Sequence, residues 1–116
     1  MNRIPLLALT GLLMATGTAA QADARLHADD WNHPRSGSMV RQLEPVRETV
    51  QAWNRQPEKL IVIRYPGGEQ GELWAGELQD WLVALGVPSS QLRRLAGGTG
   101  GSEWVRLELH SPSEAP

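Results

Sequence analysis

The sequence predicts a small domain of mixed α and β structure, in which one sheet carries two helices on one face. Three observations lead to this prediction. Residues 60–65 (LIVIRY) form an unbroken apolar run, typical of a central strand that is covered on both faces. Residues 45–56 and 69–85 each place apolar side chains at helical spacing. Residues 103–110 (EWVRLELH) alternate apolar and polar residues, as in a strand with one face toward solvent.

The expected order of elements is β-α-β-α-β-β, an α/β or α+β layer with right-handed crossovers. We place a short strand at 39–43, because a helix there would take Pro45 into its interior at a cost of about 3 kcal/mol. Pro45 suits the first turn of the next helix instead. The alternative, a helix over 39–43, stays open, and it would remove one strand from the sheet.

The two long helices have clear ends in the sequence. The first, from about 45 to 56, turns Val46, Val50 and Trp53 toward the core and stops at Pro57. The second follows the break at 66–68 (PGG) and is closed by glycine and proline at 86–88 (GVP).

The C-terminal part is expected to be a hairpin. A weak strand at 91–95 leads through the flexible loop 96–102 (AGGTGGS) into the strand at 103–110. In this last strand the inward residues are Val105, Leu107 and Leu109, and the outward residues are Trp104, Arg106, Glu108 and His110.

Residues 1–22 have the features of a cleaved secretory signal. Arg3 precedes an apolar run from Ile4 to Ala15, and overlapping A-x-A sites end at Ala22 or Ala24. The run is shorter than the ~20 residues that a membrane-spanning helix needs. We therefore expect a bacterial protein exported to the periplasm, with no membrane span after signal cleavage.

Around the expected domain at 38–110, the sequence predicts two segments without regular structure. Residues 23–37 are polar and show no period, so we expect a flexible arm, and residues 111–116 are expected to form a disordered tail.

Composition narrows the possible functions. The 116 residues include no cysteine, so disulfides, thiolate metal sites and cysteine catalysis are excluded. The net charge of −2 gives no reason to expect a nucleic-acid partner. His27, Asp29, Asp30 and His33 are close in sequence, but nothing rigid holds them, so no metal site is predicted.

The sequence also lacks a recognisable catalytic constellation. Every serine lies in a predicted loop or tail, and none has the surroundings of an activated nucleophile. We therefore expect neither an enzyme nor a cofactor.

Five tryptophans are unusual in a chain without phenylalanine. Trp53, Trp74 and Trp81 fit the core stripes of the predicted helices, which leaves Trp31 and Trp104 as candidates for exposure. Trp104 beside Arg106 would make a contact surface for sugar or protein. The alternative, that Trp31 of the arm covers Trp104, stays open.

Three stretches occur in an order found in a known domain family. KLIVIRYPGG (59–68) is a strand that ends at glycine, and GELWAGELQDWLVALGVPSSQL (71–92) is a helix leading through Gly-Val-Pro into a strand. EWVRLELH (103–110) closes the chain. From about residue 39 to 109 this layout resembles the OmpA-like peptidoglycan-binding domain. The resemblance implies a periplasmic domain of that fold, with peptidoglycan as the ligand.

The sequence departs from that family at its binding residues. The family holds the diaminopimelate of the wall peptide with an aspartate after the second strand and an arginine in the second helix. These positions fall near Gly67 and on Trp74 here, so both charged groups are missing. Each lost hydrogen bond to a charged group is worth about 1.5–3 kcal/mol.

We therefore expect a non-catalytic periplasmic adaptor that binds an envelope protein. Its expected contact surface lies around Trp104 and Arg106, or at the 66–72 turn, which contains Gly67, Gly68 and Glu69. The alternative is residual peptidoglycan binding through other residues, such as Arg64, Glu69 and Arg94.

Overall fold

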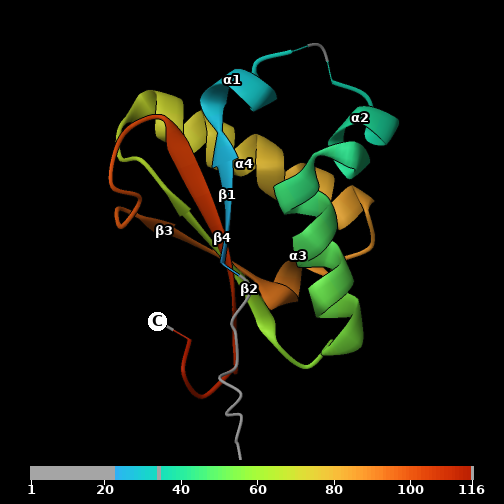
Figure 1. The fold of residues 1–116 in the computed structure, drawn as a ribbon. Helices are drawn as coiled ribbons and strands as arrows, with labels where there is room; N and C mark the ends of the chain where they lie inside the picture. The colour runs from blue at the N-terminus through green and yellow to red at the C-terminus, as the bar shows by residue number, and fades with distance from the viewer. Residues whose placement is uncertain (1–22, 34, 116) are drawn as a thin grey trace, which may run out of the picture.

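The computed structural model describes residues 23–33 and 35–115. Their central element is a mixed four-stranded sheet (Figure 1). Strands β1 (Asp23–His27), β2 (Leu60–Tyr65), β3 (Leu92–Ala96) and β4 (Trp104–His110) lie in the order β1-β4-β2-β3. β2 and β3 are parallel, and the other two pairs are antiparallel. The predicted mixed α and β fold is confirmed. The predicted signal, residues 1–22, lies outside the described residues.

The helices pack on one face of this sheet. They are α1 (Ala28–Trp31), α2 (Gly37–Gln42), α3 (Glu44–Arg55) and α4 (Glu69–Ala84), and a short 3-10 turn, η1 (Ser89–Gln91), precedes β3. α3 contacts β1, β4 and β2, whereas α4 contacts β2 and β3. The two predicted long helices are confirmed within one or two residues, and Pro45 lies in the first turn of α3 as expected.

The strand predicted at 39–43 is wrong, because this segment belongs to helix α2. The hydroxyl oxygen of Ser36 accepts a hydrogen bond from the Met39 N–H at 3.3 Å and so caps the helix, and Val40 is fully buried. Leu43 has an extended backbone, with φ −63° and ψ 123°, between α2 and α3. This single extended residue lets Pro45 open a new helix instead of interrupting one.

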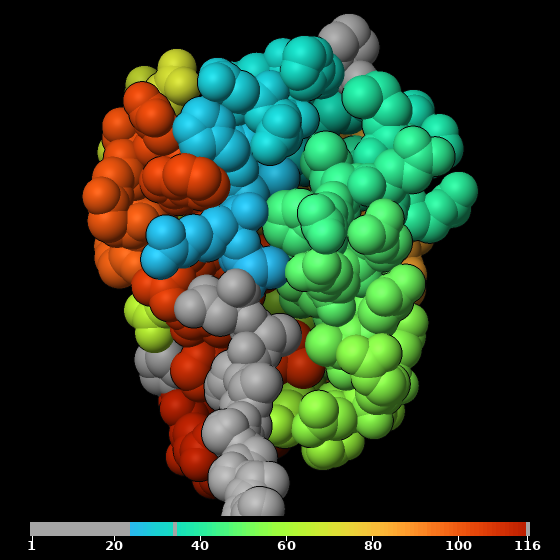
Figure 2. Space-filling view, viewed as in Figure 1, coloured from blue at the N-terminus to red at the C-terminus, as the bar shows by residue number. Residues whose placement is uncertain are grey.

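The flexible arm predicted at 23–37 is a second correction. Its first residues form β1, in which Arg25 stands opposite Arg106 of β4, and Leu26 is fully buried. The Ala28 N–H then donates to the Glu103 carbonyl at 2.9 Å. In Figure 2 this N-terminal segment (blue) lies between the segment around the start of β4 (orange) and α3 (green). The domain therefore begins at β1 and not at residue 38.

The predicted C-terminal hairpin is a third correction, because β2 lies between β3 and β4. β2, α4 and β3 form a β-α-β unit with parallel strands, which leaves the other edge of β2 for β4. Residues 97–103 cross from one side of β2 to the other, and Gly97, Gly98 and Gly100 have positive φ angles there. Residues 111–115, expected to be disordered, contain a turn closed by the Glu114 N–H on the Ser111 carbonyl at 2.9 Å.

The two faces of the sheet differ in what covers them. Toward the helices lie the buried side chains of Leu26, Ile61, Ile63, Val105, Leu107 and Leu109, as the alternation in the last strand predicted. We call the other side the open face, because the helices pack on the opposite side. By register its members are Arg25, His27, Leu60, Val62, Arg64, Arg93, Leu95, Trp104, Arg106, Glu108 and His110.

Candidate functional site

The predicted site residues separate into two regions of the molecule. Gly67 and Trp74 line a cavity beside the turn between β2 and α4. Arg64, Trp104 and Arg106 belong instead to the open face of the sheet. The structure therefore divides the expected contact residues into two candidate sites.

The cavity encloses about 190 Å³ and is walled by segments that are distant in the sequence. The first wall is the end of α1 and the turn after it, which contribute Trp31, Asn32 and Arg35. The second wall consists of the β2–α4 turn and the first half of α4, and Ser102 from the loop before β4 completes the lining. The cavity exists only because the N-terminal segment folds against α4.

Two glycines set the shape of the β2–α4 turn. Gly68 caps α4 with a φ of 97°, a conformation that L side chains rarely adopt. Gly71 lies under the turn, where a Cβ atom would come within 1.6 Å of the Pro66 carbonyl oxygen. The start of α4 and the end of β2 are therefore in close contact, and this contact fixes one wall of the cavity.

Two tryptophans of the cavity wall have buried indole N–H groups without an acceptor in the described chain. Trp31 is 3% exposed and Trp74 is 9% exposed. In contrast, the indole N–H of Trp53 donates to the Lys59 carbonyl at 3.1 Å. A buried donor without a partner costs about 1–3 kcal/mol, so both tryptophans carry an uncompensated cost in the described chain. A ligand in the cavity would reach these N–H groups only after the rings shift, because the two nitrogens have almost no accessible surface.

An ion pair lies at the same cavity. The guanidinium of Arg35 stacks over the Trp31 ring at 4.4 Å from its centroid, and its Nη2 contacts the Glu77 carboxylate at 3.1 Å. The prediction from sequence missed both residues, because Arg35 fell in the expected arm and Glu77 is one of several acidic residues on α4. No local pattern in the sequence shows that the two meet.

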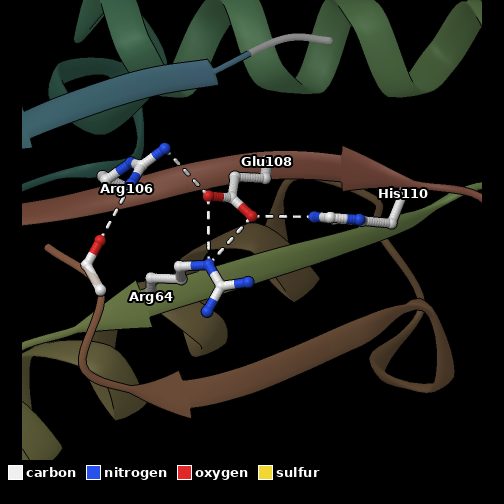
Figure 3. A network of polar contacts seen from close by, with 5 residues as sticks. Arg64, Arg106, Glu108 and His110 are labelled. Atoms are coloured by element: carbon white, nitrogen blue, oxygen red, sulfur yellow. Dashed lines mark hydrogen bonds and ion pairs between the residues drawn. The ribbon is translucent and has the colours of Figure 1, made fainter. Parts of the chain in front are cut away.

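The open face contains a network centred on the carboxylate of Glu108, whose side chain is 12% exposed (Figure 3). The Arg64 Nε–H donates to both carboxylate oxygens, at 3.0 and 3.1 Å. Arg106 Nη2 lies 3.2 Å from one oxygen, and His110 Nε2 lies 2.8 Å from the other. Arg106 also donates through Nη1 to the Gly98 carbonyl at 2.9 Å. The network therefore joins β2, β4 and the loop between β3 and β4.

This network controls the ionisation of Glu108. Burial of the carboxyl group opposes ionisation, but the hydrogen bonds from His110 and Arg64 and the charges of Arg64 and Arg106 outweigh it. The pKa of Glu108 consequently lies below its ordinary value. Glu108 is therefore a fixed negative charge at neutral pH.

The two tryptophans expected to be exposed have different surroundings. Trp31 belongs to the core cluster, so the prediction of its exposure is wrong: β1 and α1 turn its ring inward. Trp104 is partly exposed on the open face, and its ring forms a T-shaped pair with the His27 ring, with centroids 4.6 Å apart. Trp104 is thus held by a neighbour on β1 and not by Trp31.

The residues expected to support residual peptidoglycan binding are not brought together. Arg64 lies on the open face, whereas Arg94 lies on the helix side of β3, with its guanidinium close to Gly76. Glu69 is exposed in the first turn of α4 and does not line the cavity. These three side chains therefore do not form one site.

Within residues 23–33 and 35–115, no group of three or more histidine, cysteine or acidic side chains is placed to hold a metal ion. His27 uses Nδ1 to accept the Asp29 N–H at 3.0 Å, which caps α1. In the same part of the chain, no helix has both the length and the apolar character needed to cross a membrane.

Comparison of the chain with protein-family models, with curated proteins and with solved structures found no match.

Proposed function

We propose that this protein is a non-catalytic adaptor of the bacterial envelope, which binds an extended segment of a partner envelope protein in the cavity beside the β2–α4 turn. The observation that carries the proposal is the pair of buried indole N–H groups, those of Trp31 and Trp74, at that cavity. An extended peptide offers backbone carbonyl oxygens, which these donors would reach after the indole rings shift toward the cavity.

Export to the periplasm is part of the proposal and is supported by the sequence of residues 1–22. A reduced OmpA-like scaffold is supported by the presence of two long helices on one face of a four-stranded sheet. The cavity also lies at Gly67 and Trp74, the positions at which the family's charged residues are missing. We propose that the binding site keeps its place in the fold, but that it binds an uncharged peptide backbone in place of a charged ligand.

A second candidate ligand is the peptide of peptidoglycan. The Arg35–Glu77 pair at the cavity favours this ligand. Arg35 could bind a carboxylate and Glu77 an ammonium group of the same peptide. These two residues differ from the set expected from the sequence alone.

The adaptor proposal is tested by photo-crosslinking in cells from position 73. Leu73 lines the cavity and is 65% exposed, so a photoreactive side chain there is expected to form a covalent product with one envelope protein. Position 83 is the matched control, since Val83 is 44% exposed on the same helix but does not line the cavity. The product should disappear when Trp74→Phe is added. The same products from both positions would contradict the proposal.

Co-sedimentation of the purified protein with cell-wall sacculi tests the second candidate. Pelleting that is lost in Arg35→Ala and Glu77→Gln would make peptidoglycan the ligand of the cavity and replace the adaptor proposal. If the protein stays in the supernatant, peptidoglycan is excluded as the ligand and the adaptor proposal stands.

A further inference from the structure

We propose that the open face of the sheet is a second docking surface, which binds an acidic segment of a partner protein along a row of arginines. This surface is separate from the cavity and does not depend on the function proposed for it. The register of the four strands, the local charge and the contacts of the arginine side chains support this proposal.

The arginine row follows from strand pairing. Arg25 of β1 stands opposite Arg106 of β4, and Arg106 stands opposite Arg64 of β2. Neighbouring strands are about 4.8 Å apart, so the row crosses the sheet nearly at right angles to the strands. Arg93 of β3 lies on the same face, in register with Val62.

The open face is basic although the whole chain carries a net charge of −2. Its strands bring together the four arginines at 25, 64, 93 and 106, which outnumber Glu108, the acidic side chain that the described residues place on this face. A local excess of one sign attracts a partner of the other sign, even where the net charge of the protein is unfavourable.

The contacts within the face leave arginine donors available. Arg25 is exposed, and no acceptor contacts it among the described residues. Arg64 uses only its Nε–H on Glu108, so its two Nη groups have no acceptor in the described chain. Because Glu108 holds Arg64 in place through its Nε–H, the Arg64 guanidinium is pre-organised. Guanidinium groups bind carboxylates through paired hydrogen bonds, which suits aspartate and glutamate side chains.

The surroundings of the row favour an acidic protein segment over larger polyanions. Exposed Asp29 and Glu103 flank His27 at one end of the face, and they would repel a membrane surface or a nucleic acid that extended past the row. His27 and Trp104, the tryptophan of this face, form a T-shaped pair with ring centroids 4.6 Å apart, which reduces the Trp104 surface available for stacking on bases. Leu95 is partly exposed beside Arg64 and offers an apolar contact to a protein chain.

The test measures binding of a fluorescein-labelled peptide of alternating glutamate and leucine to the purified protein by fluorescence anisotropy. Arg25→Glu should weaken binding about tenfold, because it removes one charge pair and adds a repulsion. Added salt should weaken binding further. The matched control is Arg47→Glu on the exposed side of α3, which changes the net charge equally and should leave the affinity within about twofold.

Two further variants keep the test decisive. Arg93→Glu, a second exposed position on the same face, should reproduce the loss if Arg25→Glu fails to fold. Trp74→Phe, in the cavity, should bind the acidic peptide as the wild type does, so failure at one site is distinguishable from failure at the other. Equal losses in Arg47→Glu and Arg25→Glu would overturn the proposal. Equal or tighter binding of phosphatidylglycerol vesicles or single-stranded DNA through Arg25 would also overturn it.

Discussion

The cavity and the open face differ in whether their polar side chains have partners. On the open face, strand register places Arg64, Arg106 and His110 around one carboxylate, so the charged groups there largely satisfy one another. At the cavity, the indole N–H groups of Trp31 and Trp74 are buried with no acceptor in the described chain. On the open face, mutual contacts thus fix the charged side chains around Glu108, whereas the cavity wall contains two donors that the described chain leaves without acceptors.

The largest expected effect concerns the wall of the cavity. Gly71→Ala should destabilise the protein by about 3 kcal/mol, because its Cβ atom would meet the Pro66 carbonyl oxygen and neither backbone can withdraw easily. Urea denaturation measures this loss. Gly76→Ala is the control on the same helix, where the Cβ atom meets only the tip of Arg94, and it should be neutral or stabilising by up to about 1 kcal/mol. Equal stabilities of the two variants would show that α4 does not press against Pro66.

The next effect concerns the open face. Glu108→Gln should cost about 2 kcal/mol at neutral pH, because it leaves two arginines without their shared carboxylate. Thermal unfolding of the wild type and the variant checks the value. Asp80→Asn, a loss of the same charge at an exposed position on α4, should change stability far less.

The pH dependence of that variant provides a separate prediction. The pKa of Glu108 is lowered in the folded state, so its contribution to stability is present above the ordinary carboxyl pKa of about 4.3 and is lost as the pH falls through the folded pKa. The stability difference between wild type and Glu108→Gln should therefore shrink below about pH 4. A difference that stays constant down to acid pH would contradict the role assigned to the ionised carboxylate.

The smallest effect compares two tryptophans. Trp53→Phe should cost about 1 kcal/mol more than Trp74→Phe, because only Trp53 loses a hydrogen bond, the one to the Lys59 carbonyl. Trp74→Phe loses packing contacts, but it also removes a buried N–H group without a partner. The second effect stabilises the folded state and offsets part of the first. Denaturation of both variants without ligand measures the difference, and equal costs would mean that the Trp74 N–H has a partner after all.

Local patterns in the sequence predicted the elements that carry long periodic signals. The apolar run of β2, the stripes of α3 and α4 and the alternation in β4 each depend on residues close in the chain. β1 was missed because it has only Ala24 and Leu26 as inward residues, between charged neighbours that suggest a linker. Sheet order was missed because a local pattern does not reveal which edge of β2 a later strand will join.

The candidate sites were predicted only in part, for the same physical reason. Trp104 and Arg106 were placed correctly on the outward side of the last strand, since alternation along a strand fixes the side of each residue. Arg64 was assigned to no face, because the apolar run around it does not alternate. The cavity depends on contact between residues 31–35 and α4, as in the Arg35–Glu77 pair, and that contact is a property of the tertiary fold. Gly67 and Trp74 were identified because they fall at the binding positions of the resembling family, although the partners that surround them were not.

The pairing of β1 with β4 joins the first and last strands of the described chain. Such non-local pairing slows folding, because the sheet cannot close until the C-terminal strand is available. In a protein exported to the periplasm in an unfolded state, this arrangement would delay folding until transport is almost complete. β1 directly follows the proposed signal, so the first segment to reach the periplasm pairs only with one of the last segments to arrive there.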